Sequence, residues 1–341
     1  MKVGILFGGK SFEHDISIIT CSIIYHSLKE KHDIYLIYLD KDGMIRFSKD
    51  MDLENFKNYL KLRKINFIYK GISFKYKKIK LDVIINAMHG INGEDGLAHS
   101  ISKIYDIPFV GSNNISSAVL MDKYFTYALL KSNNIKTIPT KFVFKDDELL
   151  IEDFPVIVKP ARLGSSIGIK VINNKEELSG LKDAFLFDDK VVVQPFFTDF
   201  REFNQAAYLY KGDIILSNVE EVFHKSEYLS FEDKYTDSKV NRKHILAIDK
   251  KLIERISDIT KKVYKIFELS GVIRVDYMMV NGRILLNEIN TTPGSFAYYL
   301  FETEISELLS RLIYEGLKVY QNQKKTVFES SVLDQDYNYK K

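Results

Sequence analysis

The sequence of 341 residues contains no tryptophan and only one cysteine, Cys21. A single cysteine excludes an intramolecular disulfide, so a reducing compartment fits the chain best. Cys21 lies within an apolar stretch, which favours a small buried residue over a reactive nucleophile. The chain also lacks any apolar run close to the roughly 18 residues that a membrane-spanning helix needs. We therefore expect a cytoplasmic protein with no membrane partner.

An excess of charge of one sign is also missing. The chain has 49 basic and 46 acidic residues, which gives a formal net charge of +3. This near balance gives no reason to expect a nucleic-acid partner. A signal peptide is not expected, because Glu13, His14 and Asp15 follow a short apolar run directly. Apolar content of 45% and charged content of 28% are those of a globular protein, and the length allows two or three domains.

The first part of the chain alternates between apolar strands and helices. The expected elements are strands over residues 2–7, 34–39 and 81–88 and a helix over 15–30. This alternation predicts a parallel sheet that is covered by helices. Ligands in such folds bind beyond the carboxyl ends of the strands. Gly8-Gly9 and the loop 89–96 each follow a strand, so both are expected at that edge.

The rest of the chain predicts a small α+β unit and then a unit built on hairpins. The expected elements are helices over 116–132, 175–185, 249–269 and 302–320, strands over 154–160, 167–172 and 191–193, and a hairpin of 201–210 with 214–219. Residues 221–243 are charged and aromatic with little periodicity, which is typical of a functional lid.

A hairpin over residues 274–294 is predicted by Asn281-Gly282, a dipeptide that readily takes the positive φ angles of a tight turn. Glu288 and Asn290 are two residues apart on one strand, so they point to the same face. Asp276 can lie opposite them on the paired strand. Hard oxygen ligands on a rigid sheet suit Mg²⁺, whereas the alternative is a solvated face with ordinary polar residues.

A phosphate cradle is predicted at residues 164–168, which read Gly-Ser-Ser-Ile-Gly. The turn offers backbone N–H groups and two hydroxyls, and the ammonium of Lys159 is near in sequence. Such turns are common, so the motif alone is weak. Lys159 strengthens it, because this lysine ends an apolar strand and has no evident structural task there.

A second phosphate-binding pattern occurs at residues 4–11, which satisfy G-x-x-x-x-G-K-[ST]. Three large apolar residues, Ile5, Leu6 and Phe7, would then stand where backbone amides should wrap a phosphate. They fit better as the end of the first strand, which leaves only Gly8-Gly9 as loop. We therefore disfavour a P-loop, and Lys10→Ala is the change that distinguishes the two interpretations.

Five segments in a fixed order resemble the D-alanine–D-alanine ligase family of the ATP-grasp superfamily. They are residues 8–17 (Gly-Gly-Lys-Ser-Phe-Glu-His-Asp-Ile-Ser), 89–96 (His-Gly-Ile-Asn-Gly-Glu-Asp-Gly), 111–123, 158–168 and 287–294 (Asn-Glu-Ile-Asn-Thr-Thr-Pro-Gly). Each segment alone is modest, but their order and domain-scale spacing are specific. The resemblance covers roughly residues 1–320.

The resemblance implies an α/β and α+β protein, with an ATP-grasp fold preceded by a parallel-sheet domain. The implied division is an N-terminal domain over 1–117, a central ATP-grasp subdomain over 118–196, a C-terminal subdomain over 197–322 with the lid 221–243, and a polar tail over 323–341. ATP would be held between the central and C-terminal subdomains. The family also implies a homodimer, with D-alanine and ATP as small-molecule partners.

The resemblance also implies residue roles. For ATP the residues are Lys123, Lys159, Ser165, Gln194, Phe197, Glu202 and the lid residue Lys234. For two Mg²⁺ ions, with Mn²⁺ as an alternative, they are Asp276, Glu288 and Asn290. For catalysis they are Glu13, Ser165 and Tyr235, which form a hydrogen-bonded array, and Arg274 with the Gly294 N–H, which form an oxyanion hole. Glu13 would bind the ammonium group of the first D-alanine.

The sequence departs from the family pattern at four places: Gln194, a loop before Glu202 that is one residue longer, Phe231 where a tyrosine is common, and Tyr299. Gln194 stands where the family usually has an acidic residue, and we expect tolerance because that contact is largely made by the backbone. The family also places a serine for the carboxylate of the second substrate shortly after Pro-Gly. Here Ser295 follows Gly294, and Tyr299 occupies the serine position. The second-substrate site is therefore predicted to differ in shape or specificity.

Two alternatives stay open at this point. A related ATP-grasp ligase would join D-alanine to D-serine or another amino acid, and Tyr299 is the feature that favours it. A non-catalytic nucleotide-binding descendant is disfavoured, because the lysine, arginine and acidic residues of the site are all present.

Overall fold

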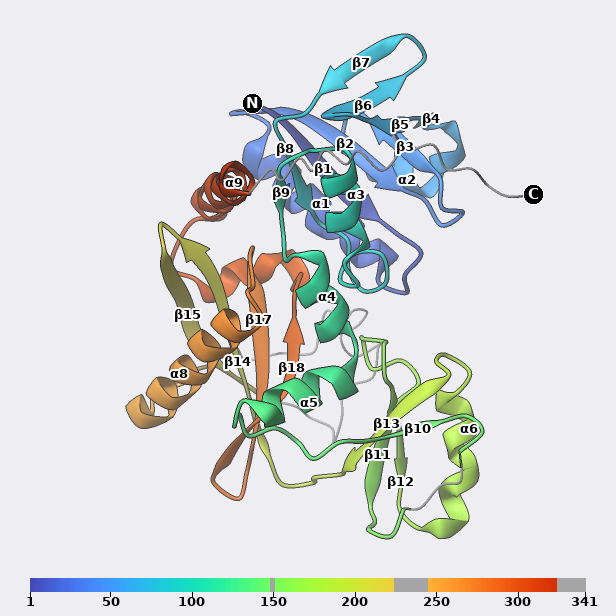
Figure 1. The fold of residues 1–341 in the computed structure, drawn as a ribbon, viewed down its shortest axis with the longest axis vertical. Helices are drawn as coiled ribbons and strands as arrows, with labels where there is room; N and C mark the ends of the chain where they lie inside the picture. The colour runs from blue at the N-terminus through green and yellow to red at the C-terminus, as the bar shows by residue number, and fades with distance from the viewer. Residues whose placement is uncertain (148–150, 224–244, 324–341) are drawn as a thin grey trace, which may run out of the picture.

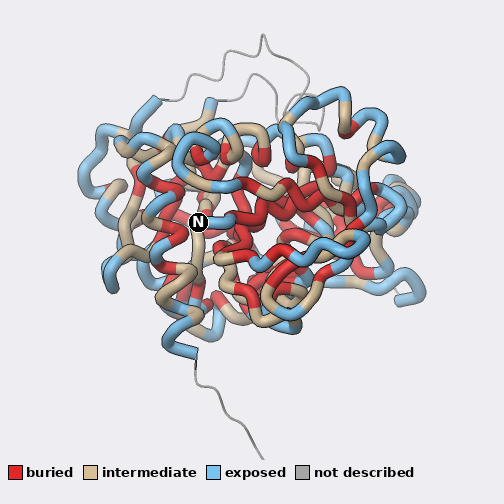
Figure 2. Tube along the Cα trace, turned by 90° about the horizontal axis from the view of Figure 1, so that it is seen from above, coloured by how far each residue is buried: buried red, intermediate tan, exposed pale blue. Residues whose placement is uncertain are grey.

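The computed structural model describes residues 1–147, 151–223 and 245–323. Most of the predicted lid over 221–243 lies outside these residues, as does almost all of the predicted tail. In Figure 1 the first sheet lies at the top, the third sheet along the chain lies below it, and the second sheet lies at the lower right. Figure 2 shows buried chain running through the middle of the molecule, with exposed loops around it.

The first sheet contains the predicted parallel strands and adds β3 and β4 antiparallel at one edge. Its central strand β1 (Lys2–Gly8) is buried along almost its whole length. A continuous apolar run suits a strand that is covered on both faces. β1 pairs in parallel with β2 and β8, and β8 pairs in parallel with β9. In spatial order the strands are β4 (Arg63–Lys64), β3 (Ile45–Ser48), β2 (Asp33–Leu39), β1, β8 (Val83–Asn86) and β9 (Phe109–Val110).

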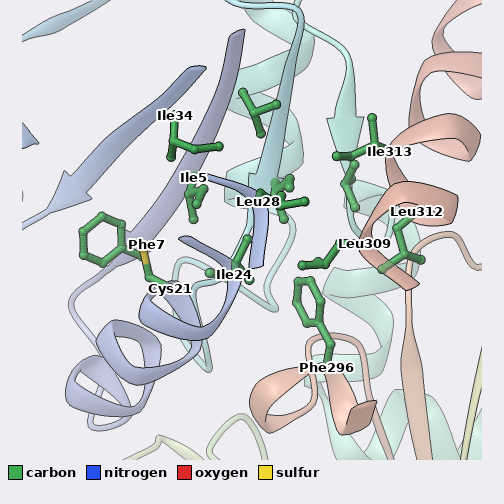
Figure 3. Close-up of a cluster of buried hydrophobic side chains, with 14 of the residues drawn as sticks. Ile5, Phe7, Cys21, Ile24, Leu28, Ile34, Phe296, Leu309, Leu312 and Ile313 are labelled. Carbon is green, nitrogen blue, oxygen red and sulfur yellow. The ribbon is translucent and has the colours of Figure 1, made fainter. Parts of the chain in front are cut away.

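Helices from both ends of the chain pack on the first sheet. Cys21 and Leu28 of α1 (His14–Leu28) lie in one buried cluster with Leu309 and Leu312 of α9 (Ile305–Asn322), as Figure 3 shows. Cys21 is fully buried, which confirms the prediction of a packed residue. The final helix therefore joins the first sheet to the C-terminal part of the chain. α3 (Leu97–Ile104) follows β8 along the chain.

A region that the sequence did not assign, between residues 45 and 80, forms short strands and turns. These elements are α2 (Leu53–Lys57), the 3₁₀ turn η1 (Tyr59–Lys61), β5 (Asn66–Ile68), β6 (Gly71–Phe74) and β7 (Lys77–Lys80). β5, β6 and β7 make a small antiparallel sheet beside the first one. The strands are too short to show a clear period of two in the sequence.

The second unit is an antiparallel sheet in the order β10-β13-β11-β12. Its strands are β10 (Lys141–Phe144), β13 (Lys190–Pro195), β11 (Val156–Pro160) and β12 (Lys170–Ile172). The predicted helix over 175–185 is instead a 3₁₀ turn, η2 (Lys175–Gly180), followed by the short α6 (Leu181–Ala184). Apolar residues from this helix and the strands form a separate core.

The helix predicted over 116–132 is wrong in one respect. The structure has two helices, α4 (Asn114–Met121) and α5 (Lys123–Ser132), separated by Asp122. Asp122 takes an extended conformation, with φ −92° and ψ 111°, and its carboxylate accepts hydrogen bonds from the first N–H groups of α5. An aspartate N-cap therefore ends one helix and begins the next.

The third sheet carries the predicted hairpins. Its order is β16 (Ile245–Leu246), β15 (Asp213–Val222), β14 (Arg201–Tyr210), β17 (Ile273–Val280) and β18 (Arg283–Asn290). The turn at Asn281-Gly282 is confirmed, with φ of 49° and 70°. The predicted long helix is α8 (Lys250–Ile266), and it packs on β14 and β15.

The sheets follow the order of the expected domains, while the boundaries of those domains stay predictions. Among the described residues, no helix is both long enough and apolar enough to cross a membrane.

Candidate active site

A row of oxygen-bearing side chains crosses the third sheet. Strand pairing sets Glu220 opposite Asn204, Asn204 opposite Asp276, and Asp276 opposite Glu288. Residues that face each other on neighbouring antiparallel strands point to the same side of the sheet. The predicted pair Asp276 and Glu288 is therefore confirmed as neighbours, and two further members come from β14 and β15.

Arg274 lies two residues before Asp276 and faces the same side. Its Nε and Nη2 atoms donate to the two oxygens of Asp276, at 2.7 and 2.8 Å. Asn290 Nδ2 also donates to Asp276 Oδ2, at 3.1 Å. Burial raises the pKa of Asp276, although the guanidinium works against this shift. Burial works to lower the pKa of Arg274, but its pKa is raised because the attraction of Asp276 outweighs burial. The two side chains are partly buried, with exposures of 24% and 19%.

Lys123 faces this row from the first turn of α5. Its Nζ lies 3.5 Å from Glu288 Oε1 and donates to the carbonyl oxygen of Leu163, at 2.6 Å. Lys159, near the end of β11, lines a cavity together with Lys123, the glycine-serine turn and Glu288. Two ammonium groups and the N–H-rich glycine-serine turn thus line one cavity together with Glu288.

The same cavity continues between the second and third sheets. Phe197 and Glu202 line it, together with Gln194. Gln194 is 6% exposed. Its Nε2 donates to Thr140 Oγ1, at 2.9 Å, whereas its Oε1 has no hydrogen-bond donor among the described residues. A buried acceptor without a donor is costly, so this atom is a candidate contact for a ligand.

Glu13 approaches the site from the first sheet. It lies at the start of α1, and Ser165 of the glycine-serine turn donates its hydroxyl to Glu13 Oε1. Ser165 and Ser166 both have left-handed backbone conformations, with φ of 56° and 58°. A Cβ at Gly90 would lie 2.8 Å from Glu13 Oε2 and would displace this carboxylate, and the φ of 63° at this position also favours glycine.

Sequence reasoning missed His89 and Glu94. Glu94 accepts hydrogen bonds from the N–H groups of Gly90 and Thr292, at 2.8 and 2.9 Å. His89 Nδ1 is 2.7 Å from the Thr292 carbonyl oxygen, and its Nε2 is 2.8 Å from Thr20 Oγ1. These contacts join the loop after β8 to the chain after β18. The loop 89–96 was expected at the edge of the sheet, but nothing local marked these two residues.

Burial dominates the electrostatics of this junction. It raises the pKa of Glu94 to about 8, and the nearby carboxylate of Glu13 adds to the shift. Burial also lowers the pKa of His89. Both side chains therefore favour their neutral forms near neutral pH.

The segment after Pro293 is a 3₁₀ turn, η3 (Gly294–Leu300). Ser295, Phe296 and Ala297 have left-handed φ angles of 50°, 57° and 46°, a strained run for residues with side chains. Phe296 and Ala297 are buried, so packing holds the turn in this shape. Tyr299 comes out of it into the cleft and is 45% exposed.

Most of the predicted site residues meet around one cleft. Those that line it are Glu13, Lys123, Ser165, Glu202, Arg274, Asp276, Glu288, Asn290, Gly294 and Tyr299. Lys159, Gln194 and Phe197 line the adjoining cavity, which shares Lys123, Ser165, Glu202 and Glu288 with the cleft. Ser295 is not among the lining residues, and its N–H donates to Thr20 Oγ1, at 3.3 Å. Lys234 and Tyr235 lie outside the described residues.

The pattern for a P-loop is not realised. Gly4 to Gly8 belong to β1, where Ile5, Leu6 and Phe7 are buried. Lys10 is exposed, and its N–H donates to Asn92 Oδ1, at 2.8 Å.

Comparisons with known proteins agree along the whole chain. The family model for the D-ala D-ala ligase N-terminus matches residues 2–112, and the family model for the D-ala D-ala ligase C-terminus matches residues 123–319. A D-alanine–D-alanine ligase of Thermosipho melanesiensis is 35% identical over 98% of both chains.

Solved structures give the same result. The D-alanine–D-alanine ligase of Helicobacter pylori is 30% identical, with a TM-score of 0.78 over 96% of this chain and 100% of that chain. The VanG D-Ala:D-Ser ligase of Enterococcus faecalis is 26% identical, with a TM-score of 0.78 over 92% of this chain and 99% of its own.

The fold and the cleft between its sheets define an ATP-grasp enzyme of the carboxylate–amine ligase class. Within that class, the chain belongs to the D-alanine–D-alanine ligase family.

The raised pKa of Glu94 predicts a loss of stability as the pH rises. Between about pH 4.5 and 8 the unfolded chain releases this proton while the folded protein keeps it, so the free energy of unfolding falls with pH. Glu94→Gln cannot ionise and should lack this fall. In thermal unfolding without ligands, the Tm of Glu94→Gln should exceed that of the wild type by on the order of 5 °C at pH 9. The difference in Tm should be smaller at pH 5.

Glu254→Gln, an exposed change on α8, is the control and should leave the pH profile unchanged. If Tm changes with pH in Glu94→Gln as it does in the wild type, the raised pKa of Glu94 is contradicted.

Proposed function

We propose that the protein joins two molecules of D-alanine at the expense of ATP, and forms D-alanyl-D-alanine, ADP and phosphate. This product is the dipeptide used for peptidoglycan precursors. One observation carries the proposal: the acidic row and Arg274 line one cleft with Lys123 and the Glu13–Ser165 contact, and Lys159 lines the cavity that adjoins it. Groups suited to phosphate (Lys123), to an amino acid (Glu13) and to a developing negative charge (Arg274) therefore line the same cleft.

The cavity beside Gln194 suits the adenine base of ATP. Its buried Oε1 would accept a hydrogen bond from the 6-amino group, which supplies the donor that the described residues lack. The ring of Phe197 offers an apolar wall, and Glu202 would accept hydrogen bonds from the ribose hydroxyls. Lys123, Lys159 and Ser165 would then contact the phosphates.

The acidic row suits Mg²⁺. Asp276, Glu288 and Asn290 supply hard oxygen atoms, which fit Mg²⁺ or Mn²⁺. The described residues contain no group of three or more acidic, histidine or cysteine side chains that could hold a metal by themselves. Two ions would therefore be completed by phosphate oxygens of ATP. When bound, they would neutralise charge on the phosphates during transfer.

The first step forms an acyl phosphate. A carboxylate oxygen of the first D-alanine attacks the γ-phosphorus, and the bond from this phosphorus to the ADP oxygen breaks. Lys123 and Lys159 neutralise charge that develops on the transferring group, which is the main task of a protein in phosphoryl transfer. Glu13 would hold the ammonium group of this D-alanine, because its carboxylate lies at the edge of the cleft.

The second step forms the peptide bond. The neutral amine of the second D-alanine attacks the acyl carbon. Phosphate leaves with the original carboxylate oxygen and takes up the proton that the nitrogen loses. Arg274 and the Gly294 N–H would stabilise the oxyanion, and both line the cleft. Lys234 and Tyr235 would close the site against water, which would otherwise hydrolyse the acyl phosphate. Their roles stay predictions, as do a homodimer and a cytoplasmic location.

D-Serine as the second substrate is not favoured, because the curated relatives that span the chain are D-alanine–D-alanine ligases. Tyr299 still departs from the family pattern and lines the cleft beside Arg274. We therefore assign it to the pocket of the second D-alanine and not to a change of activity.

The direct test of the function uses purified protein with Mg-ATP and single D- or L-amino acids. Phosphate release should depend on D-alanine, and mass spectrometry should identify D-alanyl-D-alanine. Phosphate release that requires D-alanine together with another compound would mean that this compound, and not a second D-alanine, is the second substrate. No turnover and no product with any pair would favour a non-catalytic nucleotide-binding protein.

Lys159→Ala and Glu288→Ala should each reduce turnover by at least about 100-fold, because the first removes a cation at the phosphates and the second removes a ligand of the Mg²⁺ ions. Lys10→Ala should leave turnover within about twofold, since this lysine is exposed and outside the cleft. Steady-state phosphate release measures all three. Loss of activity in Lys10→Ala alone would instead support the P-loop interpretation.

Tyr299→Ala should raise the KM of the more weakly bound D-alanine by about tenfold and leave the KM of ATP unchanged. The change removes a ring that bounds the cleft, and the loss of one such contact is worth on the order of 1 kcal/mol. Tyr314→Ala is the matched control, because Tyr314 has the same 45% exposure and lies on α9. An unchanged KM for D-alanine in Tyr299→Ala would remove this residue from the pocket.

A further inference from the structure

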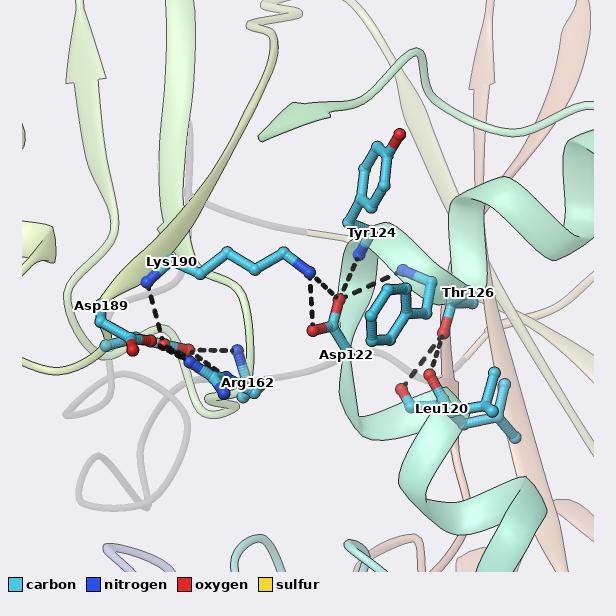
Figure 4. A network of polar contacts seen from close by, with 10 residues as sticks. Leu120, Asp122, Tyr124, Thr126, Arg162, Asp189 and Lys190 are labelled. Atoms are coloured by element: carbon cyan, nitrogen blue, oxygen red, sulfur yellow. Dashed lines mark hydrogen bonds and ion pairs between the residues drawn. The ribbon is translucent and has the colours of Figure 1, made fainter. Parts of the chain in front are cut away.

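Lys190 is a buried lysine that none of the roles above uses. It is the first residue of β13, and the residue as a whole is 5% exposed. Its Nζ lies 2.8 and 3.0 Å from the two carboxylate oxygens of Asp122, which is 4% exposed (Figure 4). The pair joins the second sheet to the break between α4 and α5.

Aromatic rings enclose the ammonium group on its other sides. Its Nζ is 4.2 Å from the ring centre of Phe125, 5.2 Å from that of Tyr124 and 5.3 Å from that of Phe142. Ring faces attract a cation, and they also exclude water from it. Lys190 is therefore held in one place by a carboxylate and by rings from two elements, α5 and β10.

Asp122 has a second task at this point. Its Oδ1 accepts hydrogen bonds from the N–H groups of Tyr124 and Phe125, at 2.9 and 3.1 Å. It thereby caps α5, whose first residue is Lys123. The carboxylate that pairs with Lys190 thus also sets where the helix that carries Lys123 begins.

Backbone hydrogen bonds through Ala161 also connect Lys190 to Lys123. The carbonyl oxygen of Lys190 accepts the Ala161 N–H at 2.9 Å, and that of Ala161 accepts the Lys123 N–H at 3.0 Å. Lys123 Nζ then donates to the Leu163 carbonyl oxygen, directly before the glycine-serine turn. One residue, Lys190, therefore contacts both segments that fix the position of the Lys123 ammonium group.

Asp188 ties the same segments together again. Its Oδ1 accepts the Lys190 N–H at 3.1 Å, and its Oδ2 accepts the Arg162 N–H at 2.8 Å. The guanidinium of Arg162 also pairs with Asp188 and Asp189. The start of β13 and residues 161–163 are therefore a single fixed unit.

We propose that Lys190 is a positioning residue for nucleotide binding: through Asp122 and Ala161 it holds the Lys123 ammonium group against the phosphates of ATP. The inference rests on the proposed function for the role of Lys123. A buried ion pair is not needed for stability, since apolar residues of similar size often serve as well. Its effect here is geometric, because displacement of a contact group by about 1 Å can reduce activity by 10²-fold.

The test is the affinity for Mg-ATP without D-alanine, measured by calorimetry. Lys190→Met keeps the length of the side chain and removes the charge, and it should weaken binding by about tenfold. Lys170→Met is the matched control, because it removes a lysine of the same sheet whose pair with Asp183 lies at the surface. This control should bind Mg-ATP within twofold of the wild type.

A cycle with Lys123→Ala separates positioning from a general structural defect. If Lys190 acts through Lys123, Lys190→Met should weaken binding less than twofold further once Lys123 is alanine. Equal loss in both backgrounds would overturn the inference. Lys190→Met that binds like the wild type would also overturn it.

Two further variants keep the test decisive if Lys190→Met does not fold. Lys190→Arg retains the charge and should keep binding within about threefold. Asp122→Asn retains a capping oxygen but removes the charge that pairs with Lys190. Like Lys190→Met, it should therefore lower the affinity for Mg-ATP. Wild-type affinity in Asp122→Asn would contradict the inference. A wild-type protein that does not bind Mg-ATP would instead refute the proposed function.

Discussion

The site depends on strand pairing that gathers acidic side chains into one row beside a partly buried arginine. Asp276 and Glu288 face each other because β17 and β18 are joined by a tight turn, and the pairing with β14 and β15 extends the row. Such a row would repel itself without cations. Arg274 provides one within the sheet, and Lys123 provides another from α5. The carboxylate oxygens that remain are available to the metal ions that would bind the phosphates of ATP.

The parts of the site that lie within one hairpin could be predicted from the sequence. Asn281-Gly282 predicted the turn, and the alternation of strand faces predicted the placement of Asp276 with Glu288. The parallel first sheet also followed from continuous apolar runs. Helical periodicity failed at Asp122, because the pattern of apolar residues continues through a position that takes an extended conformation. Only its capping hydrogen bonds show that one helix ends there.

Contacts between distant segments could not be predicted from spacing. Glu13 meets Ser165, and Glu94 meets Thr292, only after the sheets pack together. The resemblance to a family supplied Glu13 and Ser165, but it did not supply Glu94 or Lys190. Both are ordinary charged residues in the sequence, and burial by other parts of the chain gives them their importance. Burial is a tertiary property, so no local pattern records it.

The central claim is that a carboxylate is activated by phosphoryl transfer before the amine attacks. Turnover of D-alanine labelled with ¹⁸O in both carboxylate oxygens tests this claim most directly. One labelled oxygen should appear in the released phosphate, because the acyl phosphate leaves with a carboxylate oxygen, and the dipeptide should keep the other label in its new amide. Phosphate released without label would mean that water attacks ATP directly, and it would contradict the account.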